Sequence, residues 1–272
     1  MHEFVFASVF ILGTLSVVAW GQPEAEPTNA DEAAKAKAAA VQELEAKYQA
    51  WVETLEPEAR AWEGVLQENL GDFYLPLHKG NKVAGKSNAW DYVVDDPKLP
   101  RVLLIGDSIS RGYTLPVRNA LEGKANVHRA PANCGPTAMG LEKIDLWLGD
   151  GAWDVIHFNF GIHDRNTPVA DYIGRLEQLV VRMKKTGATL VWASSTPIPD
   201  IPEQNYAAAS IVRLNQAAEN IMQGHGIGMD DLFSAVTPHL GELQNDQDVH
   251  FKGEGYDFLG RHVAASIEAA LK

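Results

Sequence analysis

The segment Arg101–Arg111, with the sequence RVLLIGDSISR, most constrains what this chain can fold into. Its four aliphatic residues at 102–105 are typical of a strand that is buried on both faces of a parallel sheet. Gly106 permits a sharp turn, Asp107 and Ser108 follow where the strand ends, and the pattern becomes helical after Gly112. This order places Ser108 at the carboxyl edge of a parallel sheet, where open α/β folds keep their sites. Ser108 is therefore a candidate nucleophile.

From Leu99 onward, apolar runs alternate with helical patterns. The expected strands are 102–105, 125–128, 155–160, 189–193 and, more weakly marked, 227–229. The expected helices lie near 114–122, 137–148, 168–185, 206–224 and 255–271. This alternation predicts a parallel sheet with helices on both of its faces, built from right-handed crossovers.

The amino terminus predicts export. Residues 4–18 are apolar apart from small residues, yet they are too few for a comfortable membrane span. Ala19 and Gly21 place small side chains where a signal peptidase cleaves, which predicts a signal peptide at residues 1–21. The leading segment lacks Lys and Arg, and an uncleaved anchor is the alternative. We expect a periplasmic or extracellular protein with no stable membrane insertion after cleavage.

Residues 22–98 form a predicted linker and helical extension, and its helices carry no group of residues that indicates catalysis. The linker is rich in Pro and Glu, and residues 31–56 then predict one long helix. An apolar seam from Val41 to Leu55 is expected to pack on the main domain. A second helix is expected from Pro57 to Gly71. The segment Gly80–Ser87 matches a phosphate-binding loop, but no buried strand precedes it and no helix follows, so we expect a surface loop.

Composition excludes several partners. The formal net charge is -13 and no basic stripe occurs, so nucleic acid and anionic membrane surfaces are poor partners. Cys134 is the only cysteine, which rules out an intrachain disulfide and a cysteine-rich metal site. Cys134 has no paired histidine in its sequence context and is interpreted as structural.

A serine nucleophile needs a base, and His250 is the best of the nine histidines. It lies in the polar loop 245–251, just before the last predicted helix, with Asp248 two residues earlier. A carboxylate beside an imidazole fixes the tautomer of the ring and stabilises the imidazolium. An incidental histidine in an acidic surface loop is the alternative.

Oxyanion donors are expected beside the first strand. His163 follows the strand 155–160, and its neutral ring could donate an N–H to an oxyanion. Asp164 could hold the loop backbone at this place. Gly135 follows the second strand and can bring its N–H close to a ligand because it has no side chain. Ordinary loop architecture is the alternative for each of them.

These pieces, in this order, resemble the SGNH (GDSL-type) hydrolases. Gly106–Ile109 is similar to the first block of that family, and Gly135 stands where the family keeps its second-block glycine. Gly161–Asp164 is similar to the third block and Asp248–His250 to the fifth. The resemblance covers 99–272, the predicted hydrolase domain. It implies a flavodoxin-like three-layer α/β/α sandwich with about five parallel strands, and a serine esterase that uses no metal or cofactor.

The resemblance also implies roles for these residues. Ser108 would attack the acyl carbonyl, His250 would accept its proton, and Asp248 would orient the imidazole. The backbone N–H groups of Ser108 and Gly135, together with the side chain of His163, would bind the oxyanion. Asp107 and Asp164 would support the site.

Two departures from the family pattern concern the third and fifth blocks. The third block has His163 where the family usually has Asn. The family commonly has an aspartate three residues before the histidine, but Gln247 occupies that position and Asp248 stands one residue closer. A Ser-His dyad is therefore the alternative to a triad.

The expected function is removal of a small acyl group, most plausibly acetyl, from a polar substrate such as a carbohydrate. One alternative is a lipase or thioesterase that uses the same serine chemistry. The other is a catalytically silent carbohydrate-binding or scaffolding module. Arg111, Tyr113 and Arg165 flank the predicted site and are candidates for substrate contact.

Overall fold

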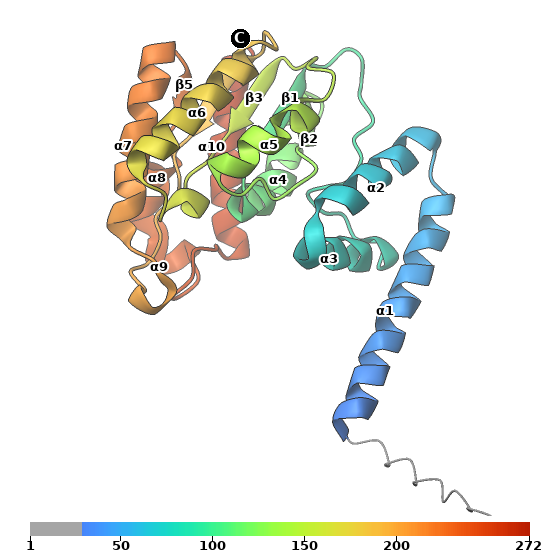
Figure 1. Ribbon diagram of the computed structural model, residues 1–272. Helices are drawn as coiled ribbons and strands as arrows, with labels where there is room; N and C mark the ends of the chain where they lie inside the picture. Colours follow the sequence, from blue (N-terminus) through green and yellow to red (C-terminus); the bar gives the residue numbers. More distant parts are fainter. Residues whose placement is uncertain (1–28) are drawn as a thin grey trace, which may run out of the picture. The chain divides into compact units, whose positions relative to one another are not determined.

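The structure, a computed structural model, describes residues 29–272 (Figure 1). The predicted signal peptide at 1–21 lies outside the described residues. The contacts divide the chain into one unit that ends at Glu43 and a second unit, Leu44–Lys272, that carries the whole sheet. Helix α1 (Asn29–Glu53) runs from the first unit into the second. Among the described residues, no helix combines the length and the apolar character that a membrane span requires.

Five parallel strands form the sheet of the second unit, as the sequence predicts. Their order is β2-β1-β3-β4-β5, which is flavodoxin-like. The strands are β1 (Arg101–Ile105), β2 (Asn126–Arg129), β3 (Val155–Phe158), β4 (Thr189–Ala193) and β5 (Gly228–Asp230). The chain reverses its direction of sheet growth between β1 and β3, so the crevice at their carboxyl ends is the expected ligand site.

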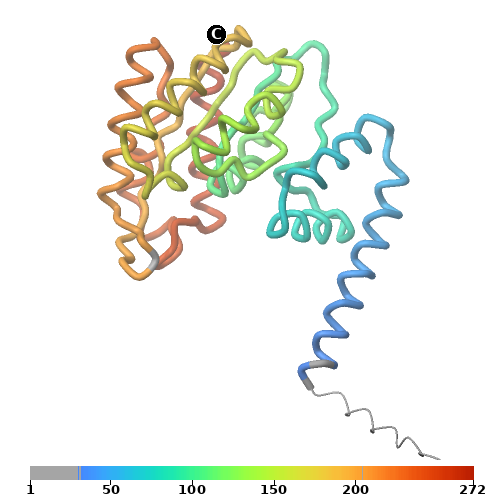
Figure 2. Tube along the Cα trace, in the orientation of Figure 1, coloured from blue at the N-terminus to red at the C-terminus, as the bar shows by residue number. Residues whose placement is uncertain are grey.

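Helices cover both faces of the sheet, which completes the predicted three-layer sandwich (Figure 1). One face packs against α5 (Thr137–Leu148), α6 (Val169–Lys184) and α7 (Ala208–His225). The other face packs against α4 (Ser108–Ala120) and α10 (Gly253–Ala270). Figure 2 shows that α4 and the C-terminal α10 lie side by side although they are far apart in the sequence.

Short helices connect these elements beyond β3. They are the 3₁₀ turns Ile162–Asp164, Pro202–Gln204 and Thr237–His239, and the short helices α8 (Leu232–Val236) and α9 (Leu240–Leu243). The sequence pattern did not predict them, because none is long enough to show a helical period.

Helix α4 begins at Ser108, earlier than the sequence pattern indicated. Oδ1 of Asp107 accepts a hydrogen bond from the N–H of Ile109 at 2.9 Å, which caps the helix. The helix was expected to begin after Gly112, but Gly112 lies inside it. A Cβ at this position would lie 2.0 Å from a ring carbon of Tyr256, so glycine is needed for the close approach of α10.

The helical extension contains one more helix than predicted. Helix α2 (Pro57–Asn69) is followed directly by α3 (Gly71–Val83), which includes Pro76. The segment that resembles a phosphate-binding loop therefore begins in the last turn of a helix rather than as the predicted surface loop. A phosphate loop precedes a helix, so this position excludes that interpretation.

A buried polar network holds the extension together. Oε2 of Glu63 accepts a hydrogen bond from the hydroxyl of Tyr48 at 2.5 Å and lies 2.8 Å from Nε2 of His78. All three side chains are buried. The apolar seam thus packs Tyr48 onto α2 and α3 rather than onto the sheet domain as expected.

Candidate active site

The Ser108 hydroxyl lies at the start of α4, within hydrogen-bonding distance of an imidazole. Oγ of Ser108 is 2.9 Å from Nε2 of His250. Nδ1 of the same ring is 2.8 Å from Oδ1 of Asp248. The structure therefore connects hydroxyl, imidazole and carboxylate in one chain of hydrogen bonds, the arrangement that activates a serine.

The position of Asp248 resolves the concern raised by its sequence spacing. Gln247 has a positive φ of 51°, which turns the loop sharply just before Asp248. Oδ1 of Asp248 accepts from the backbone N–H of His250 at 3.2 Å as well as meeting the ring. A carboxylate two residues before the histidine thus reaches Nδ1 because the loop folds it back onto that residue.

The hydrogen bonds at His250 also favour the ionised form of Asp248. Partial burial alone would raise the pKa of the Asp248 carboxyl group. Hydrogen bonds from the ring and the backbone N–H of His250 outweigh burial and hold that pKa below its ordinary value. Asp248 is therefore ionised at neutral pH, as the orientation of an imidazole requires.

The loop after β2 is tied to the turn that carries Ser108. The N–H of Cys134 donates to the carbonyl oxygen of Gly106 at 3.1 Å. Gly135 follows with a φ of +54°, a conformation that glycine adopts without strain. The structure therefore holds the segment that leads into Gly135 against the strand end that leads into Ser108.

Asp164 joins this loop to the one after β3. Its side chain is fully buried, and Oδ2 accepts from the N–H of Thr137 at 2.7 Å. Oδ1 accepts from the hydroxyls of Thr137 and Thr167 at 2.9 and 3.1 Å. Because Thr137 begins α5, the carboxylate also lies at a helix N-terminus, which favours its negative charge.

His163 lies in the turn between β3 and α6 and keeps its ring accessible. The side chain is 37 % exposed, and Nε2 is 4.0 Å from Oδ2 of Asp107, beyond hydrogen-bonding distance. The ring nitrogen that faces Asp107 is therefore free to donate to another group.

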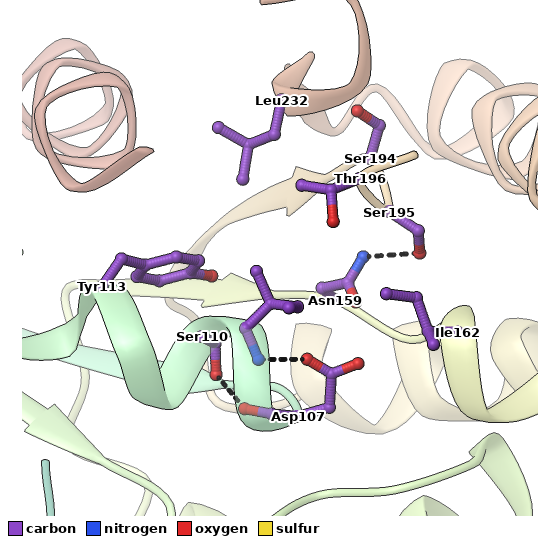
Figure 3. Close-up of a pocket in the computed structure, with 10 residues that line it drawn as sticks. Asp107, Ser110, Tyr113, Asn159, Ile162, Ser194, Ser195, Thr196 and Leu232 are labelled. Atoms are coloured by element: carbon purple, nitrogen blue, oxygen red, sulfur yellow. Dashed lines mark hydrogen bonds between the residues drawn. The ribbon is translucent and has the colours of Figure 1, made fainter. Parts of the chain in front are cut away.

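A small cavity lies behind the Ser108 turn, under the ends of β3 and β4 (Figure 3). It measures about 10 Å³ and is far too small for an acyl group. In its wall, Nδ2 of Asn159 donates to the carbonyl oxygen of Ala193 at 2.8 Å and to Oγ of Ser195 at 3.1 Å. These contacts fix the ends of β3 and β4, and an acyl group must be bound elsewhere.

The three candidates for substrate contact have different surroundings. The prediction that Tyr113 contacts substrate is wrong, because its side chain is only 2 % exposed and lines the small cavity. The guanidinium of Arg111 lies over the ring of Tyr74, 5.4 Å from its centroid. Arg165 stacks over Tyr206 at 4.4 Å.

Arg129 and the buried state of Cys134 were not apparent in the sequence. Arg129 ends β2, is fully buried, and donates to the carbonyl oxygens of Gly106 and Asp107 at 2.9 and 3.0 Å. Burial raises the pKa of the Cys134 thiol to about 12, so the thiol is protonated at neutral pH.

Within residues 29–272, no three His, Cys, Asp or Glu side chains are grouped so that they could hold a metal ion.

The part of the chain that carries this site matches a known protein family. The model of the GDSL-like lipase/acylhydrolase family matches residues 104–258, more than half of the chain. That match includes the Ser108 turn, the loops at Gly135 and His163, and the histidine loop. No curated protein sequence matches the chain significantly.

Solved structures share the fold at low sequence identity. A lipase/acylhydrolase from Enterococcus faecalis superposes with a TM-score of 0.58 and 21 % identity, over 64 % of this chain and 97 % of that one. An acetylxylan esterase from Geobacillus stearothermophilus gives 0.54 and 16 %, over 62 % and 94 % of the two chains. An acetyl xylan esterase gives 0.54 and 14 %, over 61 % and 99 %. These structures share the fold, and the family match shows that the chain belongs to the GDSL-like lipase/acylhydrolase family and is a carboxylic ester hydrolase.

Proposed function

We propose that this protein is a serine esterase that removes a small acyl group, namely acetyl, from a polar substrate such as a carbohydrate. The observation that carries the proposal is the continuous hydrogen bonding from Ser108 through His250 to Asp248. The acetylxylan esterases that share the fold favour an acetylated glycan as the substrate.

In the proposed mechanism, Oγ of Ser108 attacks the carbonyl carbon of the ester while Nε2 of His250 takes the hydroxyl proton. The tetrahedral intermediate collapses, His250 gives that proton to the leaving alcohol, and an acyl-Ser108 ester remains. Water then attacks the acyl carbon while His250 accepts one of its protons. The second tetrahedral intermediate collapses, the bond to Oγ of Ser108 breaks, His250 returns the proton to Oγ, and the acid is released. Asp248 holds Nδ1–H throughout and stabilises the imidazolium.

Three donors are proposed for the oxyanion of both tetrahedral intermediates: the N–H groups of Ser108 and Gly135 and the ring of His163. Ser108 is the first residue of α4, and the positive end of the helix dipole adds to the stabilisation there. His163 can serve in the tautomer that carries hydrogen on the nitrogen facing the oxyanion. That requirement distinguishes it from the asparagine usual in the family, whose side-chain amide always carries N–H donors.

The catalytically silent module is the weaker alternative. An inactivated site loses the contact between serine and imidazole or between imidazole and carboxylate, and both distances here lie below 3.0 Å. A lipase or thioesterase would use the same three residues and differs only in its acyl group. Export through a signal peptide at residues 1–21 remains part of the proposal, because it would place the enzyme where acetylated glycans occur.

Substitution of Ser108 tests the proposed chemistry. Ser108→Ala should lower kcat for p-nitrophenyl acetate by roughly 10⁴- to 10⁶-fold, since the attacking oxygen is removed. Initial rates at 400 nm with purified protein provide the measurement. The exposed Ser234→Ala variant is the matched control and should keep the wild-type rate. Unchanged hydrolysis by Ser108→Ala would exclude Ser108 as the nucleophile.

The acyl group is tested by comparing chain lengths. Acetate esters should give the highest kcat/KM in a series of p-nitrophenyl esters from acetate to decanoate, and acetylated xylo-oligosaccharides should release acetate in a Ser108-dependent way. Acetate release can be followed by NMR. A kcat/KM that rises toward decanoate would instead identify a lipase-like enzyme.

The role of His163 can be separated from substrate binding. His163→Ala should raise the barrier for kcat by roughly 2–4 kcal/mol with little change in KM, as loss of one oxyanion donor does. His163→Asn restores an amide donor and should recover most of the turnover. Steady-state kinetics of both variants with p-nitrophenyl acetate decide this, and an unchanged kcat for His163→Ala would assign the ring a structural role.

Ionisation of Asp248 should not limit activity near neutral pH. Its pKa is lowered in the folded protein, so the stabilising contact with His250 is complete above the ordinary carboxyl pKa and is lost only as pH falls through the lowered value. Asp248→Asn should therefore lower kcat at every pH from 5 to 8, by about 10- to 100-fold, less than for a fully buried orienting aspartate. Asp246→Asn in the same loop is the control. Equal kcat for wild type and Asp248→Asn would favour the dyad.

A further inference from the structure

Arg129 lies directly beneath the turn that carries Ser108. Nη2 donates to the carbonyl oxygens of Gly106 at 2.9 Å and Asp107 at 3.0 Å, and Nη1 donates to Oγ of Ser110. Its side chain is among the largest that the protein buries completely. Every hydrogen bond that the structure gives this guanidinium thus ends within two residues of the nucleophile.

Burial of the Arg129 guanidinium costs free energy that no paired carboxylate offsets. Among residues 29–272, it has no ion pair with a carboxylate, and its hydrogen-bond acceptors are neutral. Removing a cation from water in this way costs several kcal/mol. Because burial disfavours the charged form, it lowers the pKa of Arg129. The ring of Trp90, 5.7 Å from Cζ, offsets part of this cost. A neutral donor would hold the turn at lower cost, so the charge at this place requires its own explanation.

The bond to Asp107 has a direct consequence for Ser108. The carbonyl of Asp107 and the N–H of Ser108 belong to the same peptide group, and in a trans peptide the two bonds point in opposite directions. Arg129 shares this carbonyl oxygen with the N–H of Arg111 at 3.0 Å and the hydroxyl of Ser110 at 3.1 Å. With the carbonyl directed at the guanidinium, the Ser108 N–H points away from it. A hydrogen bond from a cation also polarises the peptide and makes its N–H a stronger donor.

The bond to Gly106 connects a second part of the site. The same carbonyl oxygen of Gly106 accepts from the N–H of Cys134, the residue before Gly135. The guanidinium therefore contacts the strand end to which both segments with proposed backbone donors are attached.

We propose that Arg129 is a positioning residue of the esterase: it orients and polarises the peptide that presents the Ser108 N–H, and its buried charge favours the oxyanion. The role rests on the proposed function. Arg129 does not touch the substrate and acts through the Asp107–Ser108 peptide.

Arg118 provides a matched control. It is another largely buried arginine, with its pKa lowered to about 10 by burial, and it also donates to backbone carbonyls. Its partners are Val127 at 2.9 Å, Asn88 at 3.3 Å and Asp91 at 3.4 Å, all outside the Ser108 turn. Loss of Arg118 therefore removes comparable packing and hydrogen bonds without affecting the proposed oxyanion donors.

The experiment compares Lys and Met variants at both arginines with p-nitrophenyl acetate. Arg129→Met should lower kcat by roughly 100-fold, as loss of an oxyanion donor does, with KM within about 3-fold of wild type. Arg129→Lys keeps the charge but not the forked N–H donors of the guanidinium, and it should recover part of that loss. Arg118→Met should keep kcat within about 3-fold at a similar decrease in Tm. A folded Arg129→Met with wild-type kcat, or an equal loss in Arg118→Met, would overturn the role.

Arg129→Met could fail to fold, and the lysine pair then decides. Arg129→Lys should show a lower kcat than Arg118→Lys when both are assayed well below their Tm values, and equal kcat values would exclude the proposal. A wild-type protein without Ser108-dependent hydrolysis would remove the proposed function and this role with it. An active wild type together with an equally active Arg129→Met would remove the role of Arg129 alone.

Discussion

The hydrogen bond between Ser108 and His250 is the interaction on which the rest of the site depends. It joins residues 142 positions apart in the sequence at a distance of 2.9 Å. The two residues are brought together by the packing of α4, which starts at Ser108, against α10, which starts just after His250. The helices approach closely because Gly260 meets Pro116, where an added Cβ would lie 2.4 Å from a proline carbon. The chemistry of the serine is therefore a consequence of helix packing.

Around this hydrogen bond, buried charges fix the loops that would bind an oxyanion. Asp164 is an anion held by donors of the α5 start and of its own loop, and Arg129 is a cation held by carbonyls of the Ser108 turn. Each is completely or almost completely buried, and each joins segments from different strands. Hydrogen bonds to charged groups are stronger and more strictly oriented than neutral ones, which suits loops whose N–H groups must keep one direction.

Much of this architecture could be predicted from the sequence. The five strands are short apolar runs bounded by turn residues, so their positions agree with the structure within a few residues. Ser108, His250 and Asp248 were found because catalysis needs rare residue types next to strand ends and loops. That Asp248 reaches the ring could not be predicted, since it depends on the positive φ of Gln247. The start of α4 was missed because Gly112 indicates a turn, whereas the glycine serves contact with Tyr256.

Roles that depend on long-range packing could not be predicted from the sequence. Nothing in the sequence around Arg129 distinguishes a buried arginine from an exposed one at a strand end. Tyr113 follows Ser108 closely and suggested a substrate contact, but the helical period turns its side chain into the core. The third helix of the extension was missed because Pro76 lies within it and breaks the expected pattern.

The central claim is that His250 activates Ser108 for attack on an acyl carbon. The most direct test is labelling of the purified protein with a fluorophosphonate, followed by peptide mass spectrometry. The account predicts one adduct, on Ser108, whose rate of formation falls by roughly 10³-fold or more in a folded His250→Ala variant. An unlabelled Ser108 in the wild-type protein, or labelling at the same rate without His250, would contradict it.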